Sequence, residues 1–188
     1  PTSGGFSVHD LKTGKALGDF DDPSYGKDGY GIAVDEEHQR VFVSNRDFRL
    51  NPPGQELTSA AVTVSERVLP ETLTYESAGH LASVDRSKAN LPAGMAYSES
   101  RDVLYLGDQN SRKIFEIDPD TDKVLGEMTL PENIRDIGID DENNLLYVGQ
   151  QNRNWLVVSI APDTFGQVVR GPYPTIESNR SIDVDPTL

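Results

Sequence analysis

The sequence predicts an all-β chain built from a repeated unit of about four short antiparallel strands. Three stretches, starting at Ile32, Met95 and Ile137, each contain an alternating apolar run, a polar turn and a second apolar run that carries an aromatic residue. Alternation with period two, rich in Val, Leu and Tyr, is typical of strands rather than helices. A unit of about 40 to 50 residues with four strands is the signature of a β-propeller, in which sheets stack radially because one sheet cannot bury both of its faces alone.

Two markers set the phase of the repeat. Phe42, Tyr105 and Tyr147 occupy the same place in the second apolar run and lie 63 and 42 residues apart. Tight turns between strand-like runs supply the second marker, because Pro presets the turn φ and Asp and Thr side chains bond turn backbone groups. These turns contain Thr13, Thr72, Thr121 and Thr164. The first full unit is longer by about 13 residues, which fall within residues 46–60.

We expect the whole chain, residues 1–188, to be a single propeller segment. The blade repeats fall near residues 31–82, 94–130 and 137–171, and partial blades fall at 5–20 and 181–188. The first partial blade has the pattern of two outer strands, and the last has that of a lone inner strand. Soluble proteins avoid unpaired strand edges. The prediction is therefore about three full blades from a ring of six to eight, completed by missing blades or by another chain.

The third unit, "LPAGMAYSESRDVLYLGDQNSRKIFEIDPDTDKVLGEMTLP", resembles the YVTN and NHL kinds of propeller repeat. The shared pattern is a proline, an apolar inner strand, an "LYV"-type strand, an Asn-containing exit and a "D-x-x-T-x-K-V" hairpin. The resemblance covers Gly5 to Leu188 and is degraded in the second unit. It implies the fold. It says little of function, because this fold hosts lactonases, lyases, oxidoreductase subunits and binding scaffolds.

Composition narrows the classes of partner. Against 17 basic residues stand 31 acidic ones, a net charge of −14, which argues against nucleic acid and anionic membranes as partners. No apolar run is long enough to span a membrane. The chain has no Cys, which excludes disulfides, thiolate metal sites and Cys nucleophiles. We expect an extracellular or periplasmic protein, with which this composition is compatible.

Polar residues gather where the loops of one propeller face surround the mouth of the channel. The predicted ligand-binding residues of this face are Arg135, Arg180, Asn45, Asp108, Gln150 and Tyr30. The planar donor fork of Arg suits a carboxylate or a phosphate, and the amides and Asp108 suit hydroxyls or a cation. The alternative is structural: Arg135 pairs with Asp136 or Asp108, and the amides cap strand ends.

The insertion at residues 46–60 lies on the same face. It begins with Arg46, Asp47, Phe48 and Arg49, which we expect to form a lid or a partner contact, because long loops without strand pattern are often functional.

Two further motifs carry little weight. The three His residues, His9, His38 and His80, fall on different parts of the repeat, which argues against a His metal centre or a Ser-His-Asp triad. The Asp118-x-Asp120-x-Asp122 spacing is similar to a calcium loop, but the required Gly and final Glu are missing. We therefore interpret it as a hairpin turn.

The favoured function is a binding or scaffold propeller that recognises a small polar ligand or a protein partner, with no catalytic residue and no cofactor. One alternative is a hydrolase similar to lactonases and gluconolactonases, which would hold a divalent cation such as calcium at the channel. Another is a propeller subunit of a larger assembly.

Overall fold

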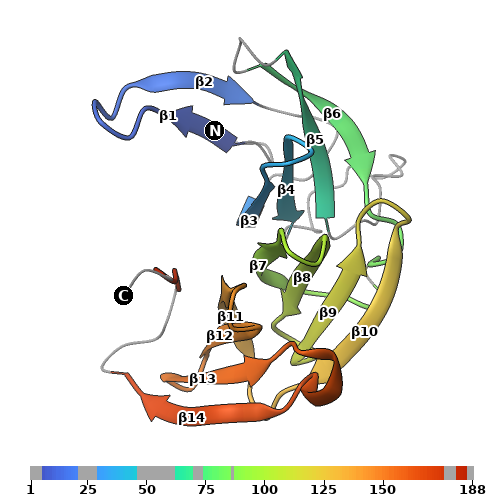
Figure 1. The fold of residues 1–188 in the computed structure, drawn as a ribbon, viewed down its shortest axis with the longest axis vertical. Helices are drawn as coiled ribbons and strands as arrows, with labels where there is room; N and C mark the ends of the chain where they lie inside the picture. Colours follow the sequence, from blue (N-terminus) through green and yellow to red (C-terminus); the bar gives the residue numbers. More distant parts are fainter. Residues whose placement is uncertain are drawn as a thin grey trace, which may run out of the picture.

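The computed structural model describes residues 6–20, 29–45, 62–69, 74–85, 87–175 and 181–185. In these ranges the chain forms three four-stranded antiparallel sheets and one two-stranded sheet. The sheets follow one another along an open arc, with the N-terminal hairpin at one end and the C-terminal segment at the other (Figure 1). The predicted fold class, an all-β propeller with three full blades and partial blades at both ends, is confirmed.

The strands follow the chain outward within each sheet. Blade 1 pairs β1 (Phe6–His9) with β2 (Ala16–Phe20). Blade 2 comprises β3 (Gly29–Asp35), β4 (Arg40–Asn45), β5 (Val62–Leu69) and β6 (Thr74–His80). Blade 3 comprises β7 (Pro92–Ser98), β8 (Val103–Asp108), β9 (Lys113–Asp118) and β10 (Lys123–Thr129). Blade 4 comprises β11 (Ile134–Asp140), β12 (Leu145–Gln150), β13 (Asn154–Ser159) and β14 (Val168–Pro174), with a short 3-10 turn η1 (Pro162–Thr164) before β14. The innermost strands are β3, β7 and β11 (Figure 1).

The core lies between neighbouring sheets. One apolar cluster joins blades 2 and 3, and a second joins blades 3 and 4. Phe42 and Tyr105 occupy equivalent places and are fully buried, and the ring of Phe42 stacks on Tyr97 of the next inner strand with centroids 5.8 Å apart. Burial of each such side chain contributes about 1.5–3 kcal/mol. Tyr147, at the same position in blade 4, stays partly exposed.

Each inner strand carries a β-bulge near its start. The ladder register shifts once in β3, once in β7 and once in β11 at corresponding points, and the bulged segments contain Tyr30, Ala93 and Arg135. A bulge leaves an extra residue outside the ladder and re-aims its side chain. The equivalence of these positions was predicted, but the bulges were not. The sheets accordingly begin at 29, 92 and 134, slightly before the predicted repeats.

Glycine lets successive inner strands approach closely. A Cβ on Gly31 would lie 2.6 Å from the Ala93 carbonyl oxygen, and one on Gly94 would overlap the Asp136 side chain. Blade 4 has Asp136 at this position, and its Oδ2 accepts a hydrogen bond from the Ile182 N–H at 2.7 Å. Residues 181–185 thus lie against β11 where the predicted lone inner strand falls, although they form no ladder with other described residues.

In the described ranges, no helix has the length and apolarity that crossing a membrane requires.

Candidate functional site: a cavity between the inner strands

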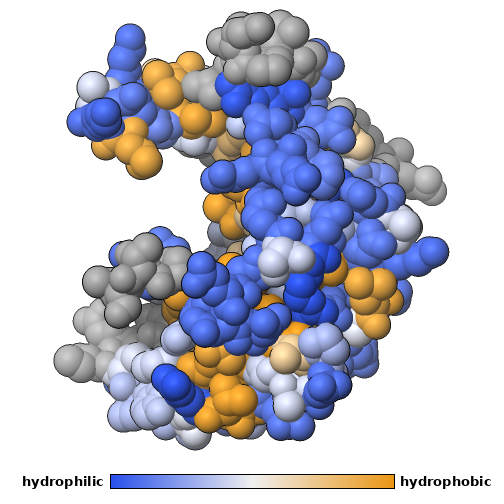
Figure 2. Space-filling view, in the orientation of Figure 1, coloured by the Kyte–Doolittle hydropathy of each residue, from blue (hydrophilic) through white to orange (hydrophobic). Residues whose placement is uncertain are grey.

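A cavity of about 670 Å³ lies where the bulges of β3 and β11 meet residues 181–183. It is lined by Tyr30, Gly31, Ile32, Met95, Arg135, Asp136, Ile137, Ser181, Ile182 and Asp183. Its volume falls in the range of small-molecule sites, about 300–1,000 Å³. The space-filling view shows the inner side of the arc hollowed (Figure 2). The cavity combines one cationic side chain, two carboxylates and several apolar side chains.

Arg135 is the cation of this cavity. Its Nε is buried and has no hydrogen-bond partner, and within the described ranges its guanidinium forms no ion pair with Asp136 or Asp108. By contrast, Arg40 pairs with Asp35 at 2.7 Å and Arg101 pairs with Glu116 at 2.7 Å. The structural salt bridge considered from the sequence is therefore not formed, and the Nε donor of Arg135, a lining residue of the cavity, has no acceptor among the described residues.

Asp136 connects strand β11 to residues 181–185 on one side and to blade 3 on the other. Its Oδ2 accepts the Ile182 N–H, and its side chain packs against Gly94 of the neighbouring blade. Burial raises the pKa of Asp136, and hydrogen bonds from Ile182, Ile137 and Ser181 only partly oppose this. The carboxyl group therefore stays protonated to a higher pH than an ordinary Asp.

This raised pKa makes stability fall as the pH rises. Because folded Asp136 holds its proton more tightly than the unfolded chain does, the free energy of unfolding decreases from about pH 4 upward, through the raised pKa. Asp136→Asn removes this titration. We expect the unfolding free energy of the variant, minus that of the native protein, to increase between about pH 3 and about pH 7 in denaturant titrations. A difference that does not vary with pH would contradict the assignment, since contributions of the other carboxyl groups cancel.

Asn45, Asp108 and Gln150 end strands β4, β8 and β12 at equivalent positions and are all buried. Asp108 accepts backbone hydrogen bonds on both oxygens, from Leu91 N at 2.6 Å and from Ser111 N at 2.8 Å. It therefore caps a strand end, the structural role weighed for these residues. The cavity lining includes Tyr30 and Arg135 but none of these three, so the structure does not bring the six predicted residues into one site.

The same three residues do not fit a divalent cation. Calcium requires several free oxygen ligands, and both oxygens of Asp108 are already used. Asn45 retains an unpartnered Oδ1, whereas the unpartnered atom of Gln150 is the donor Nε2. The remaining predicted positions, Arg180 and Arg46, Asp47, Phe48 and Arg49 of the insertion, lie outside the described residues.

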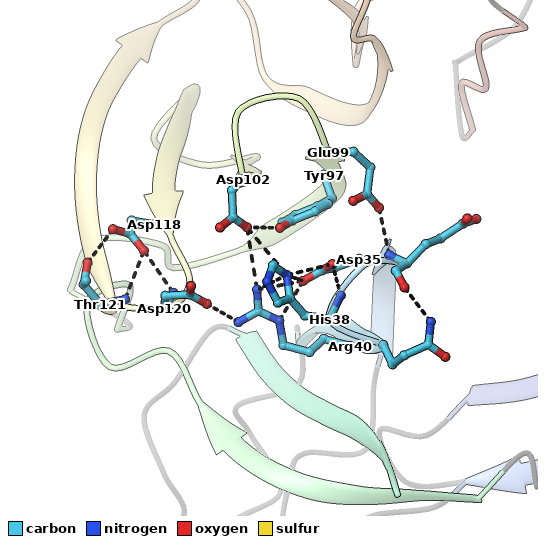
Figure 3. Close-up of polar contacts among 11 residues, drawn as sticks. Asp35, His38, Arg40, Tyr97, Glu99, Asp102, Asp118, Asp120 and Thr121 are labelled. Atoms are coloured by element: carbon cyan, nitrogen blue, oxygen red, sulfur yellow. Dashed lines mark hydrogen bonds and ion pairs between the residues drawn. The ribbon is translucent and has the colours of Figure 1, made fainter. Parts of the chain in front are cut away.

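A polar cluster at the other end of the inner strands was missed by sequence reasoning. Asp35, at the end of β3, is fully buried and lies 2.7 Å from Arg40 Nη2 and 3.1 Å from His38 Nδ1. The Arg40 Nη1 also donates to Asp120 of the β9–β10 turn (Figure 3). Burial acts to lower the pKa of Arg40, but the hydrogen bonds and charges of Asp120 and Asp35 outweigh it, so the pKa is raised.

This cluster has the atoms of a metal site but already contains a cation. Ligand atoms of Asp35, His38 and Asp102 all lie within 4.8 Å of one another. However, Arg40 Nη2 lies 3.7 Å from Asp102 Oδ1 as well as beside Asp35, and Tyr97 donates its hydroxyl to Asp102 (Figure 3). We interpret the cluster as a network of ion pairs and hydrogen bonds that holds blades 2 and 3 together. The one sequence signal for it is that Asp35, His38 and Asp102 occupy corresponding turns of adjacent repeats.

The Asp118 motif is a hairpin turn. Asp118 Oδ1 accepts the N–H groups of Asp120 at 2.9 Å and Thr121 at 3.0 Å, and Oδ2 accepts the Thr121 hydroxyl at 2.6 Å. Asp10 and Thr13 repeat the arrangement in blade 1. The Thr121 hydroxyl and amide hold the pKa of Asp118 below its usual range. These contacts give the turn the role that its Pro, Asp and Thr composition predicts.

Comparisons with known proteins support the fold alone. No family model and no curated protein matches the chain. A solved structure of hydrazine synthase from Kuenenia stuttgartiensis, a protein that contains a β-propeller, is similar with a TM-score of 0.57 and 16% identity. The match covers 89% of this chain and 42% of that chain, so this chain spans less than half of its length. At this identity the likeness is one of fold, and with the radially stacked sheets it makes the chain a β-propeller.

Proposed function

We propose that the chain is a binding or scaffold propeller of the YVTN/NHL type, which recognises its ligand or partner through the cavity between its inner strands. The observation that carries the proposal is the unpaired guanidinium of Arg135 in a cavity of about 670 Å³. Sites of this kind combine a few precisely placed polar groups with apolar side chains. Here Ile32, Met95 and Ile137 are the apolar residues of a lining that is otherwise largely polar.

Binding suits the cavity better than hydrolysis does. Nucleophilic catalysis requires a nucleophile and a base within hydrogen-bond reach. Ser181 hydrogen-bonds Asp136, but Asp136 also accepts the Ile182 N–H in the contact with residues 181–185, and no His is among the lining residues to act as a base. The lactonase-like alternative would need oxygen ligands that Asn45, Asp108 and Gln150 do not offer together.

Filling the cavity tests the proposal. Ile32 lines the cavity and is 52% exposed, so Ile32→Trp adds bulk there without disturbing the core. We would screen small amino acids, sugars and organic acids by amide NMR. We expect ligand-induced shifts at Gly31, Ile137 and Ile182 in the native protein and their loss in Ile32→Trp.

Val34→Trp is the matched control. Val34 is 50% exposed on the same strand but is not part of the cavity lining, so this variant should keep native binding. Shifts that concentrate elsewhere on the protein, or that survive unchanged in Ile32→Trp, would refute binding at the cavity.

A subunit of a larger assembly is the second candidate, because blade 4 presents a row of aromatic side chains that the described residues leave partly exposed. Tyr147 stacks with Trp155 at 6.0 Å and Trp155 contacts Tyr173 at 4.7 Å between ring centroids. Phe42 and Tyr105, which match Tyr147, are covered by the next sheet. A further β-sheet laid over blade 4 would cover this row in the same way. A particle mass above 20.7 kDa in light scattering would favour this candidate, and a monomer at all concentrations would remove it.

A further inference from the structure

We infer that the cavity selects a small organic monocarboxylate, whose carboxylate pairs with Arg135 and whose carbon chain lies against Ile32, Ile137 and Ile182. The inference rests on the proposed function, since it names the ligand class for the same cavity. It depends on three features of the described residues: an unsatisfied cation, acids that are already engaged, and apolar lining residues.

Arg135 is the one Lys or Arg among the described residues whose side chain has a buried donor without a partner. With 31 acidic and 17 basic residues, carboxylate partners are abundant. Arg40, Arg101 and Lys113 each have one, at 2.7, 2.7 and 2.6 Å. Arg135 has none among the described residues, and its buried Nε has no acceptor. A buried donor without an acceptor destabilises the protein, and a bound acceptor would remove that penalty.

The two acids of the cavity are engaged by backbone. Asp136 Oδ2 accepts the Ile182 N–H at 2.7 Å, and Asp183 Oδ1 accepts the Val184 N–H at 2.9 Å. Neither carboxylate is in ion-pair contact with Arg135. They therefore leave the guanidinium to an external anion, while Asp183 lines the cavity and repels a second negative charge. One anionic group fits this arrangement better than a dicarboxylate or a phosphate dianion.

The position of Arg135 suits carboxylate recognition. It is the extra residue of the β11 bulge, because Ile134 pairs with Gln150 and Asp136 with Gly149. A bulge frees a side chain from the regular alternation of the strand. The guanidinium fork matches the two oxygens of a carboxylate. Beside these polar groups, the lining includes Ile32, Ile137 and Ile182, which can contact a short carbon chain.

The test uses hexanoate, hexanol, succinate and inorganic phosphate as probes. We expect hexanoate to shift the Nε–Hε resonance of Arg135 and the amides of Ile137 and Ile182, and to bind at least about tenfold more tightly than the other three. Arg135→Gln should weaken hexanoate binding about tenfold or more. Arg170→Gln, on the exposed strand β14, should leave it unchanged.

Folding is checked in the same variants. Because Arg135 has no partner among the described residues, the Arg135→Gln variant should have a thermal unfolding midpoint equal to or higher than that of the native protein. The inference is overturned if hexanol, succinate or phosphate binds as tightly as hexanoate, or if Arg135→Gln retains native affinity. If neutral polar compounds shift the cavity amides and hexanoate does not, the inference fails while the proposed function stands. If no compound shifts them, both fail.

Discussion

Replacing Gly94 by alanine is expected to lower the free energy of unfolding by about 3 kcal/mol. The added Cβ would overlap Asp136 Oδ1 and would lie 2.6 Å from Ile137 N and 2.7 Å from Asp136 Cα. Two of these three atoms are backbone, and strands β7 and β11 are each fixed in a ladder. The clash therefore cannot be relieved by one side-chain rotation, and the inner strands of blades 3 and 4 must separate.

Gly126→Ala is the control for this prediction. Its Cβ would also be close to neighbours, but these are the Glu116 carboxylate and the Phe165 ring edge at 3.2 Å, which are side-chain atoms able to move. We expect an effect below about 1 kcal/mol, because the smaller entropy of the unfolded chain offsets mild crowding. Urea denaturation measures both. Equal effects of the two substitutions would mean that the inner strands are not in close contact at Gly94.

Arg40→Met is expected to destabilise the protein by about 3–5 kcal/mol. The substitution keeps most of the side-chain volume but leaves the fully buried Asp35 without its cation, and it frees Asp120 of the β9–β10 turn (Figure 3). An uncompensated buried carboxylate is far more costly than the loss of an exposed pair. Adding Asp35→Asn should recover part of the loss, because the buried charge is then removed.

Lys113→Met provides the comparison with an exposed ion pair. Lys113 and Glu127 are 2.6 Å apart, but their side chains are 32% and 51% exposed, so we expect a loss below about 1 kcal/mol. Thermal and urea unfolding of the two variants measure the contrast. If Arg40→Met lowered the free energy of unfolding no more than Lys113→Met does, the cluster at Asp35 would not stabilise the contact between blades 2 and 3.

The fold was predictable because it is written as a periodic pattern. The aromatic positions Phe42, Tyr105 and Tyr147 mark one layer in successive sheets, and strand alternation supplies the rest. The Asp–Thr turn was equally predictable, since Asp118 and Thr121, three residues apart, are hydrogen-bonded to each other. Such features depend on contacts between residues that are close in sequence, so they can be predicted from the sequence alone.

The site was predictable only in part, because it depends on contacts between blades. Alignment placed Tyr30 and Arg135 at equivalent positions, and both line the cavity. The same alignment grouped Asn45, Asp108 and Gln150 with them, yet both carboxylate oxygens of Asp108 accept hydrogen bonds from nearby backbone N–H groups. Equivalent positions in a repeat share backbone geometry and not side-chain use.

The Asp35 cluster escaped prediction for a related reason. Arg40 of blade 2 and Asp120 of blade 3 are 80 residues apart in the chain, and Tyr97 and Asp102 also belong to blade 3. No spacing rule within one repeat joins them. The bulges of β3, β7 and β11 likewise depend on ladder register, which alternation of apolar residues does not reveal.

A crystal structure of the protein with hexanoate would locate the ligand in the cavity or elsewhere. We expect hexanoate between β3, β11 and residues 181–183, with its carboxylate within hydrogen-bond distance of Arg135 and its chain against Ile32, Ile137 and Ile182. Hexanoate bound away from this cavity, or an Arg135 guanidinium turned away from its carboxylate, would contradict this expectation.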